Sequence, residues 1–153
     1  MTTIIEDTRQ KEKKHEFKHR YWESNGIGLV RSALPFGDYI LAPRRAVDTK
    51  ADIHEIAGNM CGNAREKKRF AEECKSANES GTKLYFLIED KSYSRIEDLY
   101  GKQIYLHNGM IIPGDQLATA MFTMQGRYNC EFVFCDPKDA GQKIMELLND
   151  NER

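Results

Sequence analysis

Short runs of apolar residues predict the strands of a buried sheet. Residues 83–89 form the clearest strand, because Leu84 to Ile88 are consecutive apolar side chains, as expected of a central strand covered on both faces. The other segments expected to be strands are 2–6, 28–34, 38–42, 46–50 and 131–135. The third and fourth of these are separated only by a Pro-Arg-Arg turn, so they are predicted to form a hairpin.

Capping residues and helical spacing predict the elements between the strands. Asp52 and Asn63 are typical N-caps, expected to begin a short helix through Ile56 and a longer helix that ends near Glu79. The other segments expected to be helical are 11–25, 95–100, 113–125 and 137–148, and the segment expected to be a loop is 107–109. Because strands and helices alternate, the pattern indicates a single α/β domain over residues 1–153, with helices packed on a mixed sheet.

Composition and charge exclude several classes of protein. With 23 Lys and Arg against 24 Asp and Glu, the formal charge is -1, so any surface for nucleic acid must be a local patch. The 4 cysteines form no CxxC pair and follow no secretory leader, which favours reduced thiols over a structural zinc site. No apolar run is long enough to span a bilayer, so we expect a cytoplasmic protein that makes no contact with a membrane.

Acidic residues lie at the ends of predicted strands, at positions Asp7, Asp38, Asp48 and Glu89. If neighbouring strands present matching ends, these carboxylates converge on one edge of the sheet. Clustered carboxylates raise one another's pKa unless a cation neutralises them, so the cluster favours a hard ion such as Mg²⁺. Lys50 lies two residues after Asp48 and is expected on the same face of the strand. Acids with one lysine suit phosphodiester hydrolysis, in which a metal activates water and a lysine orients or helps deprotonate it.

Each of these residues also has an ordinary structural explanation. Asp38 follows a glycine in a turn, and Asp48 with Lys50 can be a solvated strand face or a weak surface pair. Glu89 lies at a junction between a strand and a loop, where polar residues are common. The functional interpretation therefore depends on the joint occurrence of these residues.

Six short motifs follow one another along the chain: EDTRQ at 6–10, LPFGDY at 34–39, VDTK at 47–50, a basic helix from Arg65, LIE at 87–89 and a closing helix to Leu148. Their order resembles the XPF-type nuclease domain of the restriction-endonuclease-like PD-(D/E)xK superfamily, whose motifs read VDxRE, LxxGDY, ERK and IE. The resemblance covers nearly the whole chain. It implies a mixed β-sheet flanked by α-helices and a structure-specific DNA endonuclease that uses Mg²⁺ or Mn²⁺.

The resemblance also assigns roles by position. It implies Asp38 and Asp48 as metal ligands, Asp7 and Glu89 to complete or tune the site, Lys50 to orient the water, and Arg9 and Arg65 to face phosphates. Arg44 and Arg45, at the predicted turn between two motif-bearing strands, are further candidates for contact with DNA. The helix around Arg65 also contains Glu66, Glu72 and Glu73, so a solvated surface explains most of its charges equally well.

The chain departs from the family pattern at three places. Asp48 replaces the glutamate of ERK, Thr49 replaces its arginine, and His54 stands where an aspartate usually follows. No helix-hairpin-helix module follows the nuclease motifs, so we expect a stand-alone catalytic domain, which by resemblance forms a homodimer. The alternatives are a catalytically silent DNA-binding or partner-binding domain and a more distant restriction-like nuclease that acts on ordinary duplex or on RNA.

Overall fold

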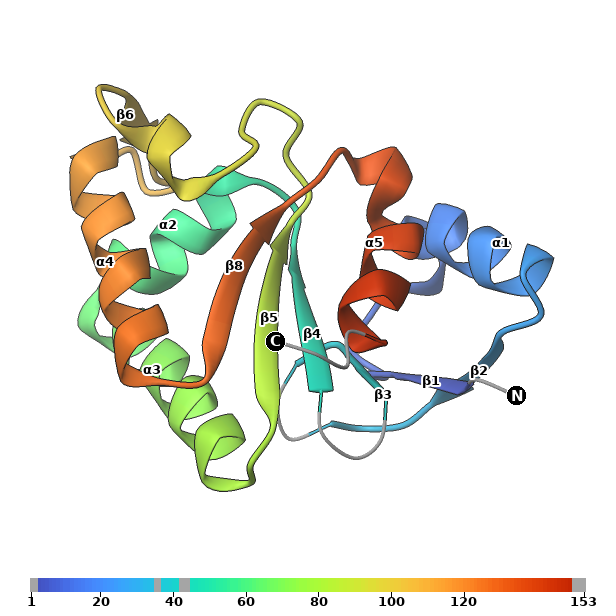
Figure 1. Ribbon diagram of the computed structural model, residues 1–153. Helices are drawn as coiled ribbons and strands as arrows, with labels where there is room; N and C mark the ends of the chain where they lie inside the picture. The colour runs from blue at the N-terminus through green and yellow to red at the C-terminus, as the bar shows by residue number, and fades with distance from the viewer. Residues whose placement is uncertain (1–2, 35–36, 42–44, 150–153) are drawn as a thin grey trace.

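A six-stranded mixed sheet forms the centre of the computed structural model, which describes residues 3–34, 37–41 and 45–149 (Figure 1). The strands are β1 (Thr3–Glu6), β2 (Gly28–Arg31), β3 (Tyr39–Leu41), β4 (Arg45–Lys50), β5 (Lys83–Ile88) and β8 (Cys130–Phe134), in the order β2-β1-β3-β4-β5-β8. β3 is antiparallel to both of its neighbours, and the other pairs are parallel. The predicted hairpin and mixed α/β fold are therefore confirmed.

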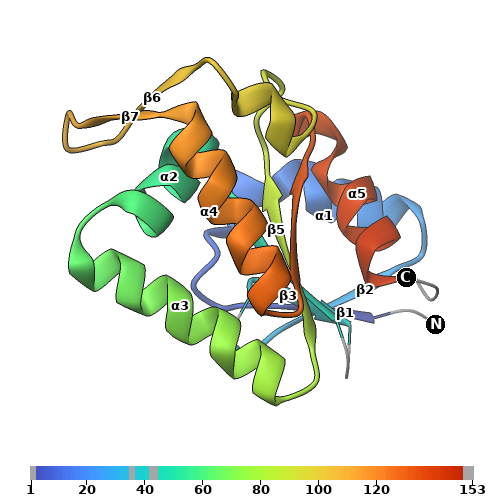
Figure 2. The same ribbon diagram turned by 60° about the vertical axis from the view of Figure 1, so that its left-hand side comes forward.

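Helices cover both faces of the sheet (Figures 1 and 2). The α-helices are α1 (Glu16–Ser24), α2 (Ile53–Cys61), α3 (Ala64–Glu79), α4 (Gly114–Arg127) and α5 (Ala140–Leu148), and the 3-10 helices are η1 (Glu12–His15), η2 (Ile96–Leu99) and η3 (Pro137–Asp139). α1 and α5 pack on one face, and α2, α3 and α4 pack on the other. Within the described ranges, no helix has the length and apolar character needed to cross a membrane.

The alternation of side chains along β5 separates two hydrophobic cores. Phe86 and its alternate neighbours face α2, α3 and α4, whereas Tyr85 and Leu87 face α1 and α5. Phe86 stacks between Phe70 and Phe132, with ring centroids 4.7 and 5.1 Å away. Burial of one such ring contributes about 1.5–3 kcal/mol, so this stack holds α3 firmly against the sheet.

The predicted caps of α2 and α3 are both present. Asp52 accepts a hydrogen bond from the Glu55 N–H at 2.9 Å, and Asn63 accepts one from the Glu66 N–H at 2.9 Å. α2 is longer than predicted, because its helical backbone continues through Gly58. The predicted helix over 11–25 divides into η1 and α1.

Two short strands, one on each side of the predicted loop 107–109, form a second small sheet. β6 (Gln103–Tyr105) pairs with β7 (Ile111–Pro113), and Gly109 has the positive φ of 87° that the turn requires. Each strand buries a single isoleucine, Ile104 or Ile112, between exposed neighbours. The sequence pattern missed this hairpin because three residues are too short for a visible alternation.

Candidate active site

The ends of β1 and β4 and the start of β3 form one wall of an acidic cleft of about 660 Å³. Helices α2 and α3 form the other wall. Its acidic lining residues are Asp7, Asp38, Asp48, Glu55, Glu66, Glu72 and Glu73, and its basic ones are Arg9, Lys50 and Arg69. Seven acids against three cations leave a formal excess of four negative charges if all are ionised. A cleft with this balance attracts cations and repels phosphate unless a cation is bound.

Backbone hydrogen bonds bring three of the predicted acids together. The Asp7 N–H donates to the Asp38 carbonyl at 2.7 Å, and the Asp38 N–H donates to the Val47 carbonyl at 2.6 Å. Asp48 follows Val47 directly on β4. The chain segments are thus held together where the carboxylates of Asp7, Asp38 and Asp48 line the cleft.

Thr49 holds the carboxylate of Asp38. Its backbone N–H and its Oγ1 both donate to Oδ2 of Asp38, the hydroxyl at 2.9 Å. Desolvation by burial, followed by the charge of Asp48, raises the pKa of Asp38 well above its usual value, and the Thr49 hydrogen bonds oppose that rise. Asp38 is therefore an acid that favours a nearby cation.

Lys50 and Asp48 form a buried ion pair in the cleft. Nζ of Lys50 lies 3.2 Å from Oδ1 of Asp48, and the two side chains are 11% and 9% exposed. Burial alone lowers the pKa of Lys50, but the neighbouring carboxylates, Asp48 first, outweigh burial and raise it. Lys50 is therefore a charged donor at neutral pH, which suits orientation of an oxygen better than removal of a proton.

Glu73, from α3, is the functional candidate that the sequence interpretation missed. Its Oε2 accepts a hydrogen bond from the Gly37 N–H at 2.8 Å. Burial, then the charge of Asp48 and a hydrogen bond with Asp48, raise the pKa of Glu73 to about 9. Glu73 belongs to a helix whose charges a solvated surface explains equally well, yet its spacing from Phe70 and Ala77 places it on the buried face of α3. That spacing is the signal that distinguishes Glu73 from Glu72.

Asp7 is neutralised by a neighbouring arginine. It is 1% exposed and accepts hydrogen bonds from Nε of Arg9 and, at 3.1 Å, from the Leu34 N–H. Arg9 also donates to the Leu34 carbonyl at 3.0 Å, although 71% of its side chain remains exposed. Arg9 therefore lies at the rim of the cleft, where its guanidinium is accessible to a phosphate.

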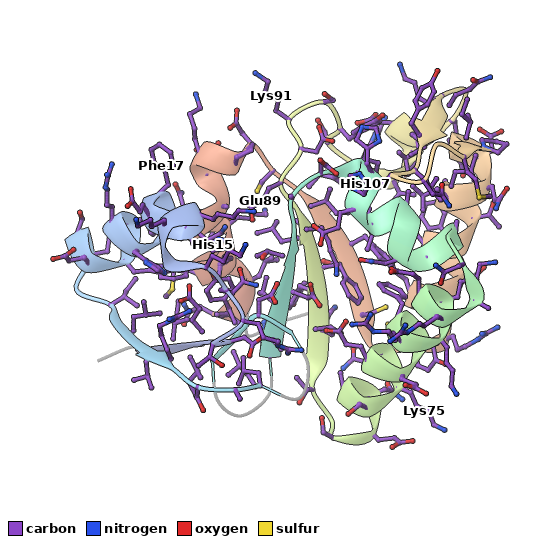
Figure 3. All side chains as sticks on the ribbon, turned by 180° about the vertical axis from the view of Figure 1, so that it is seen from behind. His15, Phe17, Lys75, Glu89, Lys91 and His107 are labelled. Carbon is purple, nitrogen blue, oxygen red and sulfur yellow. The ribbon has the colours of Figure 1, made fainter. Side chains whose placement is uncertain are left out.

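Glu89 lies on the other face of the sheet, outside the cleft (Figure 3). Its Oε2 is 2.8 Å from Nζ of Lys18 on α1, and these side chains are 12% and 4% exposed. Ile88, the last residue of β5, faces α2 and α3, so alternation turns the next side chain toward α1. The expectation that Glu89 joins the other acids is therefore corrected.

The predicted DNA-contacting arginines occupy different places. Arg45 is at the far end of β4, where it donates to the Leu147 carbonyl at 3.3 Å, and it does not line the cleft. Arg65 is exposed on α3 but also lies outside the cleft lining, whereas Arg69, one turn further along α3, is part of it. Arg44 lies outside the described residues.

A buried polar network supports the strands behind the cleft. Glu6 is 0% exposed and accepts hydrogen bonds from Nε2 of His19 at 2.7 Å, Nε of Arg31 at 2.9 Å and the Tyr39 hydroxyl at 2.8 Å. Glu6 precedes one cleft acid on β1, and Tyr39 follows another at the start of β3. Their contact fixes the two strands where those acids leave the sheet.

The cleft suits a divalent cation by its chemistry, although it is not a preformed metal site. Across the described part of the chain, no group of three His, Cys, Asp or Glu side chains stands ready to hold a metal. Within the cleft, the ammonium of Lys50 and the hydrogen bond from Glu73 stabilise the Asp48 carboxylate. The available donors are carboxylate oxygens, which are the ligands that Mg²⁺ and Mn²⁺ prefer. Their desolvation and mutual repulsion favour binding of a cation.

Comparisons with known proteins identify the family. The ERCC4 domain family model matches residues 7–148. The structure of XPF from Aeropyrum pernix matches with a TM-score of 0.66 at 19% sequence identity, over 95% of this chain and 63% of that chain. XPF from Aeropyrum pernix in complex with DNA matches with a TM-score of 0.65 at 18% identity, over 97% of this chain and 64% of that one.

These matches define what the chain shares with its relatives. No curated protein matches the sequence. The chain corresponds to less than two thirds of each XPF chain, and at these identities the structural likeness establishes the fold. The family model matches from the first cleft acid, Asp7, to the end of α5. The chain therefore belongs to the ERCC4 domain family and has the restriction-endonuclease-like fold of the XPF nuclease domain.

Proposed function

We propose that this domain is a metal-dependent endonuclease that hydrolyses DNA phosphodiester bonds at branched, flap or junction structures. The observation that carries the proposal is the meeting of Asp38, Asp48 and Lys50 in one cleft, with Asp7 beside them. Membership of the ERCC4 domain family supports a nuclease. The DNA in one of the similar XPF structures supports DNA as the partner.

The cleft residues divide the chemical work. Asp38 and Asp48, completed by Asp7, would hold Mg²⁺ or Mn²⁺. When bound, such an ion polarises the phosphoryl oxygen and lowers the pKa of the attacking water. Lys50, kept charged by Asp48, donates to the water or to a phosphate oxygen and orients it. Glu73 lies against Asp48 and limits the rotation of that carboxylate.

Basic side chains at the rim would bind the DNA backbone. Arg9 and Arg69 line the cleft and expose their guanidinium groups, which suit contacts with phosphate. Arg65 lies one turn before Arg69, in the first turn of α3, where it can extend the same contact. Because such contacts do not read bases, this surface favours recognition of DNA shape over DNA sequence.

We further propose that the domain forms a homodimer in the cytoplasm. Exposed apolar side chains gather on the β6–β7 hairpin, where Tyr105 pairs with Ile111 and Met110 precedes Ile111, and Phe122 on α4 is exposed as well. A patch of this kind is typical of surfaces that bind other proteins. Light scattering over a range of concentrations measures the mass, and a monomer at micromolar concentration would argue against this part of the proposal.

The nuclease proposal is tested with Asp38→Asn, Lys50→Met and a control, Glu79→Gln, which alters an exposed residue of α3 outside the cleft. Labelled duplex, flap, fork, four-way-junction and single-stranded DNA are incubated in Mg²⁺, Mn²⁺ or EDTA. Wild type and control should cut branched DNA with either metal. The two cleft variants should be slower by roughly a hundredfold or more, because each loses charge stabilisation worth several kcal/mol.

Two other results would change the assignment. Wild type that binds these DNAs but cuts none with either metal would be the catalytically silent binding domain. Equal cutting of linear and branched substrates, or a preference for RNA, would instead identify a more general restriction-like nuclease.

A further inference from the structure

Thr49 lies between two functional residues of the cleft, Asp48 and Lys50, yet its own side chain is uncharged. Both of its hydrogen-bond donors reach one atom, Oδ2 of Asp38, which belongs to the neighbouring segment of the sheet. The hydroxyl bond measures 2.9 Å. Two donors from one residue on one carboxylate oxygen fix that oxygen relative to β4.

This contact determines which oxygen of Asp38 is available to the cleft. A free aspartate rotates about two side-chain torsions and presents either oxygen. With Oδ2 held by Thr49, Oδ1 is the oxygen left for another partner, and no described residue donates a hydrogen bond to it. A ligand held at one oxygen presents the other in a constant position, which lowers the entropy lost when a cation binds.

We infer that Thr49 is the positioning residue of Asp38: its hydroxyl holds Oδ2 so that Oδ1 faces the divalent cation. The inference rests on the proposed function and adds a residue that acts through Asp38. A purely structural role for the hydroxyl is the competing explanation. Thr82 provides the comparison, because it is 2% exposed and its Oγ1 accepts a hydrogen bond from Ser80 at 3.0 Å, far from the cleft.

The test uses three substitutions that separate these explanations. Thr49→Val keeps the shape and the backbone N–H but removes the hydroxyl, Thr49→Ser restores the hydroxyl without the methyl group, and Thr82→Val removes a buried hydroxyl elsewhere. Mn²⁺ affinity is measured without DNA from the electron paramagnetic resonance signal of the free ion. Thermal unfolding is measured in EDTA, and flap cleavage is measured at limiting and saturating Mn²⁺.

The positioning role predicts a distinct pattern. Thr49→Val should bind Mn²⁺ roughly tenfold more weakly, the size expected for loss of one hydrogen bond to a charged group, and should cleave correspondingly more slowly at limiting Mn²⁺. Thr49→Ser should recover both properties to within about threefold of wild type. Thr82→Val should lower the melting temperature and leave Mn²⁺ affinity unchanged.

Other results would overturn the inference. Equal Mn²⁺ affinity in Thr49→Val and wild type would show that the hydroxyl does not position Asp38. In that case, cleavage of DNA by wild type would still support the nuclease proposal. Weak binding by Thr49→Ser as well as Thr49→Val shows that restoring the hydroxyl does not restore Mn²⁺ binding, which assigns the effect to the packing of the whole side chain. A wild type that neither binds Mn²⁺ nor cuts DNA removes the proposed function and, with it, the role of Thr49.

Discussion

The three aspartates of the cleft are each stabilised by a different neighbour. Asp7 has the guanidinium of Arg9, Asp48 has the ammonium of Lys50, and Asp38 has two hydrogen bonds from Thr49. Glu73 has none of these and instead keeps its proton, because burial and the charge of Asp48 raise its pKa to about 9. Glu73 is therefore a partly buried, neutral acid at physiological pH, and its ionisation destabilises the folded protein.

Substitution of Glu73 by Gln should stabilise the metal-free protein as pH rises. The pKa of Glu73 is raised on folding, so its favourable contribution is complete below its unfolded pKa near 4.5 and is lost as pH approaches about 9. Glutamine keeps the shape and never ionises. Relative to wild type, Glu73→Gln should gain up to roughly 5 kcal/mol at pH 8, about 1.4 kcal/mol for each pH unit above 4.5, and almost nothing at pH 4.5, as measured by urea unfolding in EDTA. A gain that is the same at both pH values would show that Glu73 does not titrate in this range.

At the scale of elements, the strand ends that carry acids do not all serve the same face of the sheet. β1, β3 and β4 place their acids in the cleft, whereas β5 places Glu89 against Lys18 of α1. A buried ion pair contributes little net stability while both partners remain, but loss of one partner leaves the other charge uncompensated. Glu89 therefore attaches α1 to the sheet and lies outside the cleft.

Substitution of Glu89 by Gln should separate stability from activity. The change leaves the buried ammonium of Lys18 without its counter-ion, so the free energy of unfolding should fall by roughly 2–4 kcal/mol. DNA cleavage per folded molecule at 20 °C should stay within about twofold of wild type, since Glu89 does not line the cleft. Denaturant unfolding and the cleavage rate are measured on one preparation. A hundredfold loss of rate without loss of stability would return Glu89 to the catalytic residues.

At the scale of the whole molecule, a protein with a formal charge of -1 concentrates acidic residues in the cleft between the sheet and helices α2 and α3. The acids of the cleft outnumber its cations and oppose the approach of DNA, and Arg9 and Arg69 at the rim reduce that repulsion. Binding of DNA and binding of a divalent cation are therefore expected to favour each other, because each reduces the repulsion that the other meets.

DNA affinity should depend on divalent cations even when no cutting occurs. Ca²⁺, which takes oxygen ligands but is a poor substitute for Mg²⁺ in catalysis, allows binding to be measured alone. Fluorescence anisotropy with fork DNA should give a Kd roughly tenfold tighter in Ca²⁺ than in EDTA at equal ionic strength, in line with typical coupling energies. The matched control is Asp38→Asn with Asp48→Asn, which should bind equally in both buffers. The same difference in that control would assign the effect to cations bound to the DNA itself.

Local chemistry made much of this architecture predictable. The apolar run of β5, the caps Asp52 and Asn63, and the hairpin of β3 and β4 all follow from interactions between residues near in sequence. The meeting of Asp7, Asp38, Asp48 and Lys50 was also predictable, because strand ends and alternation restrict where such side chains can lie.

The sequence by itself thus determined the order of the elements, the fold class and most of the acids at one edge of the sheet. Only the tertiary structure decided which face each strand end serves, because that depends on which helix packs there. It turned Glu89 toward α1 and brought Glu73 of α3 against Asp48. Glu73 and Asp48 are distant in the chain, and the packing of Phe70 on Phe86 that brings α3 to the sheet is a nonlocal contact that no short-range pattern encodes.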